Sequence, residues 1–335
     1  MSNPGHNKSH VLPDPHLGNS SRRAFLKGAT AVAAGFAATP KSKSAEPNLL
    51  PTIELGGQKI TRLIAGGNTL YGYSHFNMIL DQHYLDYFTD ERVVQFLLDC
   101  EKAGINAWQS NYRDRAQRQY PKIRDAGCKM NWICLADPTD ALQGGWAAIK
   151  TPEDAANAIM KVVSLAAKAK PLAMAHHGNV TDNLFRAGKL ELVREFLNKV
   201  HDLGFPAGVS THNPEVIATV EEKGWPADFY MGCFYCQSRS DEDYRRELGC
   251  VPLGESYLPA DPPRMCAVLR KTSKPCLGFK ILAAGRLCTS PQKVREAFEF
   301  AFKNLKPTDG VIVGMYPRFS DQIAENTRIV REITA

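Results

Sequence analysis

The sequence predicts a (β/α)8 barrel with a β-hairpin before it and a long loop after the sixth strand. Three observations support this prediction. Short apolar runs alternate with amphipathic stretches through most of the 335-residue chain, as expected for parallel strands joined by helices. Polar residues follow several of these runs, where each strand would end. No G-x-G-x-x-G motif follows the first run, which argues against an open dinucleotide-binding sheet.

The elements follow one another in order. Alternating residues around Gly56-Gly57 predict the hairpin over residues 52–60. Helix-start signals stand at Thr89 and Thr151, each followed by acidic residues. We expect barrel strands at residues 61–68, 105–110, 130–136, 171–177, 206–212, 227–234, 275–282 and 310–315. Helices are expected at residues 89–103, 115–126, 151–168, 190–203, 214–223, 262–272, 291–304 and 320–333, with loops at 69–88 and 235–260.

The composition is that of an ordinary globular protein, with 44% hydrophobic and 23% charged residues. The formal net charge of +6 is mild, and no basic stripe with interleaved aromatic residues is present. Nucleic acid is therefore not an expected partner. The nine cysteines are scattered, which does not resemble a disulfide scaffold, and we expect most of them to be buried.

Residues 1–45 are expected to be a twin-arginine export signal with a disordered tail, and residues 46–335 the barrel. The stretch S-R-R-A-F-L-K at residues 21–27 precedes a weakly apolar, Ala/Gly-rich run that is too short to span a bilayer stably. The expected partner is the twin-arginine translocase, and the expected location is the periplasm or another exported site. The alternative is a disordered basic tail.

Four motifs together resemble a known family. They are L-I-A-G-G-N at residues 63–68, G-V-S-T-H-N-P-E-V-I at 208–217, K-P-C-L-G-F-K-I-L-A-A-G-R-L at 274–287, and V-I-V-G-M with I-A-E-N near the C-terminus. In this order they resemble the aldo-keto reductases, over residues 51–335. The resemblance implies an oxidoreductase that uses NADP(H) on a small polar carbonyl or carbohydrate-type substrate.

The resemblance also implies catalytic residues, with departures. His176 or His177 stands at the position of the family histidine, and Tyr112 lies near that of the catalytic tyrosine. Gln109 replaces the family aspartate and Ala136 the family lysine, so neither supplies the expected charge. The implied cofactor contacts are Ser210, Thr211, Phe279, Arg318, Glu325 and Asn326. Gln322 stands where the family has an arginine for the 2′-phosphate.

The strand ends also allow other chemistry. Imidazole and thiolate are zinc ligands, so His177, His212 and Cys233 are candidate ligands for a divalent metal such as zinc. Lys280 is a candidate Schiff-base lysine, or a structural one. Aromatic residues of the first loop and of the segment after the sixth strand can wall a pocket. Two alternatives therefore stay open beside the oxidoreductase. One is a non-redox lyase, isomerase or hydrolase, with or without a metal, and the other is a catalytically silent binding protein.

Overall fold

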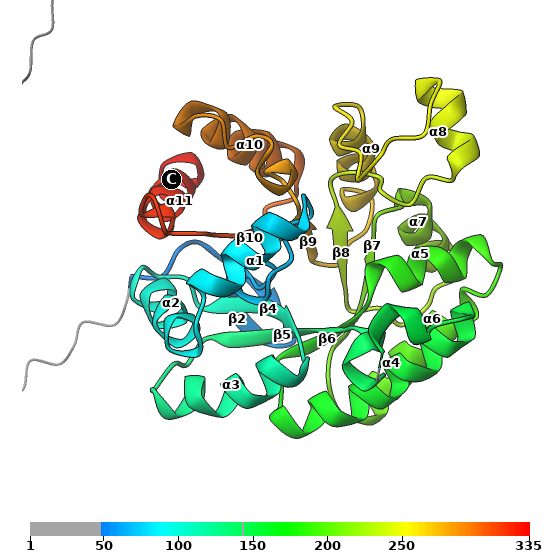
Figure 1. The fold of residues 1–335 in the computed structure, drawn as a ribbon, viewed down its shortest axis with the longest axis horizontal. Coiled ribbons are helices and arrows are strands. Elements are labelled where there is room, and N and C mark those ends of the chain that lie inside the picture. Colours follow the sequence, from blue (N-terminus) through cyan, green and yellow to red (C-terminus); the bar gives the residue numbers. More distant parts are fainter. Residues whose placement is uncertain (1–47, 143) are drawn as a thin grey trace, which may run out of the picture. The chain divides into compact units, whose positions relative to one another are not determined.

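Eight parallel strands close into a barrel in the spatial order β10-β3-β4-β5-β6-β7-β8-β9, and helices surround them (Figure 1). The computed structural model describes residues 48–142 and 144–335. The strands are β3 (Leu63–Gly66), β4 (Ala107–Asn111), β5 (Asn131–Ala136), β6 (Ala173–His176), β7 (Ala207–Thr211), β8 (Phe229–Cys233), β9 (Cys276–Phe279) and β10 (Gly310–Gly314). The predicted barrel is confirmed.

A β-hairpin closes the N-terminal end of the barrel. Strands β1 (Thr52–Leu55) and β2 (Gln58–Thr61) pair antiparallel around Gly56 and Gly57, whose φ values of 57° and 73° favour glycine. The side chains of Ile53 and Ile60 belong to the buried cluster that fills the barrel interior. The hairpin therefore covers the bottom of the barrel and leaves the C-terminal ends of the strands for a site.

Side chains alternate between the barrel interior and the layer under the helices. On β6, Ala173 and Ala175 belong to the interior cluster, whereas Met174 belongs to the outer one. Gly208 on β7 makes room for the ring of Phe229, which a Cβ at that position would overlap. The alternation decides which residues at the strand ends face the mouth of the barrel.

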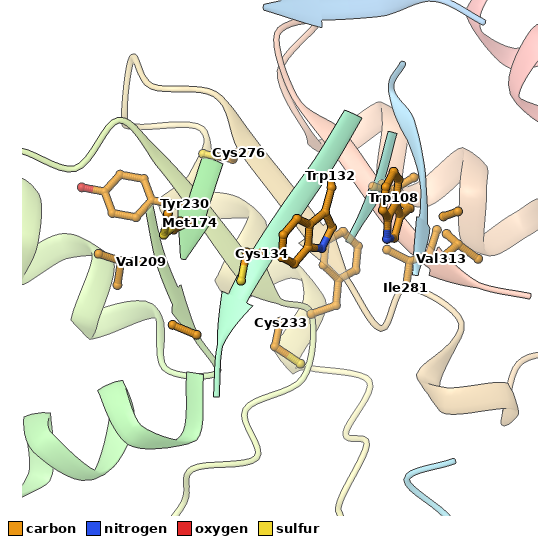
Figure 2. Close-up of a cluster of buried hydrophobic side chains, with 14 of the residues drawn as sticks. Trp108, Trp132, Cys134, Met174, Val209, Tyr230, Cys233, Cys276, Ile281 and Val313 are labelled. Atoms are coloured by element: carbon orange, nitrogen blue, oxygen red, sulfur yellow. The ribbon is translucent and has the colours of Figure 1, made fainter. Parts of the chain in front are cut away.

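The outer core lies between strands and helices. Figure 2 shows part of it, with Trp108 and Trp132 on neighbouring strands. Their ring centroids are 6.4 Å apart, and Nε1 of Trp132 donates to Oγ of Ser110 at 3.0 Å. Burial of such large rings supplies much of the apolar area that stabilises the fold.

Eleven helices occur in the described residues. They are α1 (Met78–Tyr87), α2 (Asp90–Lys102), α3 (Asp114–Asp125), α4 (Pro152–Ala166), α5 (Gly178–Arg186), α6 (Glu191–Asp202), α7 (Pro214–Glu222), α8 (Asp241–Leu248), α9 (Asp261–Leu269), α10 (Pro291–Asn304) and α11 (Gln322–Thr334).

Three of these helices were not predicted. Helix α1 buries none of its residues and so has no apolar period, but the side chain of Asn77 caps it by accepting from the backbone N of Leu80. Helix α5 begins directly after His177, and α8 lies in the long segment after the sixth strand of the barrel. Ser240 and Asp243 form a capping box at the start of α8. In Figure 1, α8 lies at the periphery of the helical ring.

All nine cysteines are free and six are buried, so the expectation that most of them are buried is confirmed. Across the described residues, no helix has the length and apolar character needed to cross a membrane. The expected export signal lies outside the described part of the chain.

Candidate active site

The C-terminal mouth of the barrel gathers polar side chains from adjacent strands. By the alternation, Gln109 of β4, Asp137 after β5, His177 after β6 and His212 after β7 face inward. Phe279 of β9 packs edge-on against His212, with ring centroids 5.6 Å apart. Active sites of (β/α)8 barrels lie at this end.

His212 is oriented by a carboxylate. Its Nδ1 donates to Oδ2 of Asp182 on α5 at 2.8 Å, and its backbone N donates to the same oxygen at 3.0 Å. Asp182 is 2% exposed and also accepts from the hydroxyl of Thr211. Because Nδ1 carries the proton, Nε2 of His212 holds the lone pair.

His177 lies beside a second carboxylate. Its Nε2 is 3.6 Å from Oδ2 of Asp137, and its Nδ1 is buried without a hydrogen-bond partner in the described residues. Burial lowers the pKa of His177, although the charge of Asp137 opposes this. Burial works against ionisation of Asp137 too, but His177 and two hydrogen bonds from Thr139 bring the pKa of Asp137 below its ordinary value. His177 is thus a neutral imidazole beside a carboxylate at neutral pH.

Asp140 extends this group of acids. Its Oδ2 accepts from the backbone N of Tyr112 at 2.9 Å, while its Oδ1 is buried without a hydrogen-bond partner, 3.5 Å from Nε of Arg113. Burial and the charge of Asp137 raise the pKa of Asp140 to about 8. The two neighbouring carboxyl groups therefore differ in ionisation at neutral pH, which is a common feature of acid–base sites.

Tyr73, from the loop after β3, covers this side of the mouth. The guanidinium of Arg113 lies 5.2 Å from its ring centroid, and its hydroxyl lies beside the side chain of Asn111. Burial raises the pKa of Tyr73, which keeps its hydroxyl protonated as a donor at neutral pH.

A second polar group lies at the opposite side of the mouth. Lys280 follows β9, and its Nζ contacts Oε2 of Glu255 at 3.3 Å and the side chain of Gln237. Nδ1 of His75 donates to Oε1 of Glu255 at 2.7 Å. Burial lowers the pKa of His75, against the hydrogen bond to Glu255. Lys280 is thus held in ionic contacts.

Two cavities open at this end of the barrel. The larger, of about 500 Å³, is lined by Tyr73, His75, Gln109, Phe279 and Lys280 and extends to the N-terminal ends of α10 and α11. The smaller, of about 230 Å³, is lined by His212 and Cys233. His212 and Phe279, whose rings are in contact, lie in the walls of different cavities, so this contact is where the two cavities approach each other.

Two of the expected catalytic residues point elsewhere. His176 faces the outer layer, where its Nδ1 contacts Oγ1 of Thr181 at 2.7 Å and its ring packs against Phe196. Burial lowers the pKa of His176 to about 3, so this histidine is a neutral core residue. The ring of Tyr112 packs on Trp132 in the same layer, with centroids 5.2 Å apart. The expected roles of His176 and Tyr112 in the site are not supported, because strand alternation turns both away from the mouth.

The expected cofactor contacts are only partly brought together. Phe279, Glu325 and Asn326 line the larger cavity. Ser210 faces the interior beside Gly178, but Thr211 faces outward and binds Asp182.

The charges around the larger cavity suit a nicotinamide dinucleotide poorly. Arg318 lies over Tyr87 and Phe319 rather than in the cavity wall. Among the described residues of that wall, Lys280 and His75 are the basic ones, and both contact Glu255. These residues do not fit the diphosphate of a dinucleotide.

The expected metal ligands do not form a set. No group of three or more His, Cys, Asp or Glu side chains within residues 48–142 and 144–335 is arranged to hold a metal ion. Nδ1 of His212 is hydrogen-bonded to Asp182, and the side chain of Cys233 is fully buried. Burial raises the pKa of Cys233 to about 12, so its thiol stays protonated at neutral pH.

Sequence reasoning missed the acidic residues of the site. Asp182 lies five residues after His177 on a helix that the sequence did not predict. Asp137 and Asp140 follow β5 in the run D-P-T-D, and this pair at a strand end was the available signal. Glu255 lies in an irregular segment, and nothing in the sequence pairs it with His75 or Lys280.

No known family model matches the chain, and no curated protein does. Similar solved structures include a truncated 3-deoxy-D-arabino-heptulosonate 7-phosphate synthase from Thermotoga maritima, at 14% identity and a TM-score of 0.48, covering 85% of this chain and 91% of the synthase. Another is a delta-aminolevulinic acid dehydratase from Toxoplasma gondii, at 10% identity and a TM-score of 0.42, covering 67% and 74%. A mandelate oxidase variant has 12% identity and a TM-score of 0.45, covering 85% and 77%. These likenesses concern the barrel fold alone.

The expected membership of the aldo-keto reductases is wrong. Neither a family model nor a curated protein of that family matches the chain. The site agrees, because Gln109 and Ala136 cannot carry the charges of that family's catalytic residues and Tyr112 is turned away. The motifs that suggested it lie mainly on strands and their ends, where (β/α)8 barrels of different families share similar apolar and glycine patterns.

Proposed function

We propose that the chain is an enzyme that moves a proton on a small hydroxy-carbonyl compound, as an isomerase or lyase does. The observation that carries the proposal is the pair of inward-facing imidazoles on adjacent strand ends, each beside a carboxylate. His212 has Asp182 at 2.8 Å, and His177 has Asp137 at 3.6 Å. A histidine oriented by an acid is a common general base or acid in enzymes.

The roles follow from the positions. Nε2 of His212 takes the proton from the carbon next to the carbonyl group, and Asp182 keeps the imidazole in the tautomer that can accept it. The electron pair moves to the carbonyl oxygen, where the hydroxyl of Tyr73 and the amide of Gln109 supply donors. In the second half of the reaction, the neutral His177 takes the proton of the substrate hydroxyl group and passes it to the former carbonyl oxygen, while the protonated His212 returns its proton to the other carbon. Asp182 and Asp137 are positioning residues.

The partial enclosure of the mouth supports this chemistry. His177 and Asp137 have side chains that are 15% and 8% exposed, and His212 is 7% exposed as a residue. Few waters can compete there for the bases, and electrostatic contacts are stronger than in bulk water.

Solvent exchange tests the proposal. The protein is incubated in D2O with a panel of small hydroxy-aldehydes, hydroxy-ketones and hydroxy-keto acids, and NMR follows loss of the C–H signal next to the carbonyl group. We expect exchange with at least one compound, and loss of that exchange in His212→Asn. The matched control is His201→Asn, because His201 also pairs with an aspartate, Asp228, at 2.7 Å, but is half-exposed on α6.

The control should keep the exchange rate of the wild type. Equal loss of exchange in both variants, or no exchange with any compound of the panel, would contradict the proposal. Circular dichroism of each variant shows whether a lost activity comes from a lost fold.

A further inference from the structure

Four donors converge on one carboxylate at the edge of the mouth. His75 donates to Oε1 of Glu255 at 2.7 Å, Tyr257 and Gln237 donate to Oε2 at 2.6 and 2.9 Å, and Nζ of Lys280 lies 3.3 Å from Oε2. Burial works against the ionised form, but these contacts hold the pKa of Glu255 well below its ordinary range. The donors thus form a well-defined receptor for a carboxylate.

The donors other than Tyr257 come from segments that follow barrel strands. Lys280 directly follows β9, Gln237 lies four residues after β8, and His75 lies in the segment between β3 and α1. His75 and Lys280 have φ values of 56° and 58°, in the left-handed region that costs a non-glycine residue of order 1 kcal/mol or more. Such conformations persist where surrounding contacts impose them, and both of these residues face Glu255.

Glu255 itself comes from an irregular segment rather than from a strand or helix. The tip beside it has Leu253 fully exposed, and a Cβ at Gly254 would meet nothing within 4 Å. Residues 250–257 contain no helix or strand. Lys280, by contrast, has a side chain that is only 8% exposed, so its ammonium group requires an anion whether or not Glu255 is in place.

We propose that His75, Gln237 and Lys280 form a carboxylate-binding pocket which Glu255 fills in the free protein, and that the carboxylate of a substrate replaces Glu255. This inference rests on the proposed function and narrows its substrate to a hydroxy-carbonyl acid. The remainder of the acid would occupy the cavity of about 500 Å³, whose wall includes His75 and Lys280.

The position of the pocket suits the proposed chemistry. Phe279, which directly precedes Lys280, contacts the ring of His212 with centroids 5.6 Å apart. An acid anchored at Lys280 would therefore lie beside Phe279, where the larger cavity approaches the ring of His212.

Binding of acetate to Glu255→Ala tests the pocket without any need for activity. The probe is sodium acetate at constant ionic strength, and the readout is the Tm. We expect a saturable rise of about 2–4 °C in Glu255→Ala, which corresponds to about 1 kcal/mol of binding in a chain of this size. The rise should be absent in the double variant Glu255→Ala with Lys280→Met.

The matched control is Glu221→Ala. Glu221 also accepts from a tyrosine hydroxyl and a lysine, Tyr230 and Lys274, the latter at 3.2 Å, but it lies on helix α7 and lines neither cavity described above. We expect no saturable effect of acetate in this variant. An equal effect there, no effect in folded Glu255→Ala, or a larger effect of phosphate than of acetate would overturn the proposal. If Glu255→Ala does not fold, Glu255→Gln takes its place, and acetate should then raise its Tm through the unpaired Lys280.

The exchange experiment separates this inference from the proposed function. Each hydroxy-keto acid is measured beside its neutral amide, and we expect the acid to exchange at least about tenfold faster, which is about 1.4 kcal/mol. Acetate binding without exchange of any compound keeps the pocket and rejects the proton-transfer function. Exchange of amides as fast as acids, without acetate binding, keeps the function and rejects the pocket.

Discussion

His176 and His177 are neighbours in the sequence, yet they lie on opposite sides of the barrel wall. His176 packs against Phe196 in the outer layer, and His177 faces Asp137 at the mouth. The alternation of β6 separates a core residue from a site residue by one position, and the two positions have different consequences when they are changed.

His177→Ala should lower kcat/KM by about 10²–10⁴-fold, because it removes one proton-transfer group. Its Tm should change little, because Nδ1 of His177 has no hydrogen-bond partner among the described residues. His176→Ala should instead cost about 1–3 kcal/mol of unfolding free energy, through the lost packing on Phe196 and the lost hydrogen bond to the Thr181 hydroxyl. Urea unfolding and steady-state kinetics measure both. The opposite pattern would reverse the assignment of the two histidines.

Asp182→Asn should lower kcat by about 10²-fold or more and change KM less. The amide can still accept from the backbone N of His212, but it no longer fixes the tautomer in which Nε2 accepts a proton. Steady-state kinetics of the exchange reaction measures the effect. Asp228→Asn, which changes the partner of His201 on the outer surface, should leave kcat unchanged.

Asp140 should make stability depend on pH in an unusual direction. Its pKa is about 8 in the folded protein against an ordinary value of 3.8, so the folded state holds a proton that the unfolded state loses. The contribution of Asp140 to the unfolding free energy is therefore fully present below about pH 4. It is lost as the pH rises toward 8. Between pH 5 and pH 7, Asp140→Asn should gain about 1–3 kcal/mol relative to the wild type. Urea unfolding at both pH values measures this.

The exposed carboxylate of Asp125 provides the control for that measurement. Asp125→Asn should keep a constant difference from the wild type across the same range. A constant difference for Asp140→Asn as well would show that Asp140 is ionised in the folded protein.

Nicotinamide dinucleotides should bind weakly and with little preference between NADPH and NADH. The side chain of Gln322 already accepts from the backbone N of Tyr316 at 2.7 Å, and Arg318 is stacked on aromatic rings. A charge-assisted contact to the 2′-phosphate, worth about 1.5–3 kcal/mol, is therefore missing. Fluorescence titration measures both affinities. Tight and strongly NADPH-selective binding would contradict this prediction.

Export stays a prediction from the sequence alone. Changing Arg22 and Arg23 together to lysine should retain the protein inside the cell, because the twin-arginine route reads the arginine pair. Fractionation of cells that express the wild type and the double variant measures this. Unchanged export of the double variant would reject the twin-arginine interpretation.

The sequence predicted the barrel well because strand and helix periods repeat around it. It also placed His177, His212 and Lys280 at strand ends, since each ends an apolar run. It did not predict α1, which buries no side chain, or the pairing of Glu255 with His75, which are 180 residues apart. The prediction that Tyr112 lies in the site was wrong. Tyr112 directly follows the last residue of β4, and successive residues of a strand point in opposite directions, so its side chain faces the outer layer. Long-range partners of this kind follow from closure of the barrel and leave no local pattern.

Glu255 is tethered to the pocket that it fills, which sets the conditions for any free competitor. A group on a short flexible tether acts at an effective concentration on the order of millimolar. A ligand with nothing but a carboxylate must exceed that concentration to enter the wild-type pocket. A larger acid gains further contacts along the cavity of about 500 Å³ and can displace Glu255 at lower concentration. The tether therefore makes the pocket discriminate between acids by the parts of the molecule that lie beyond the carboxylate.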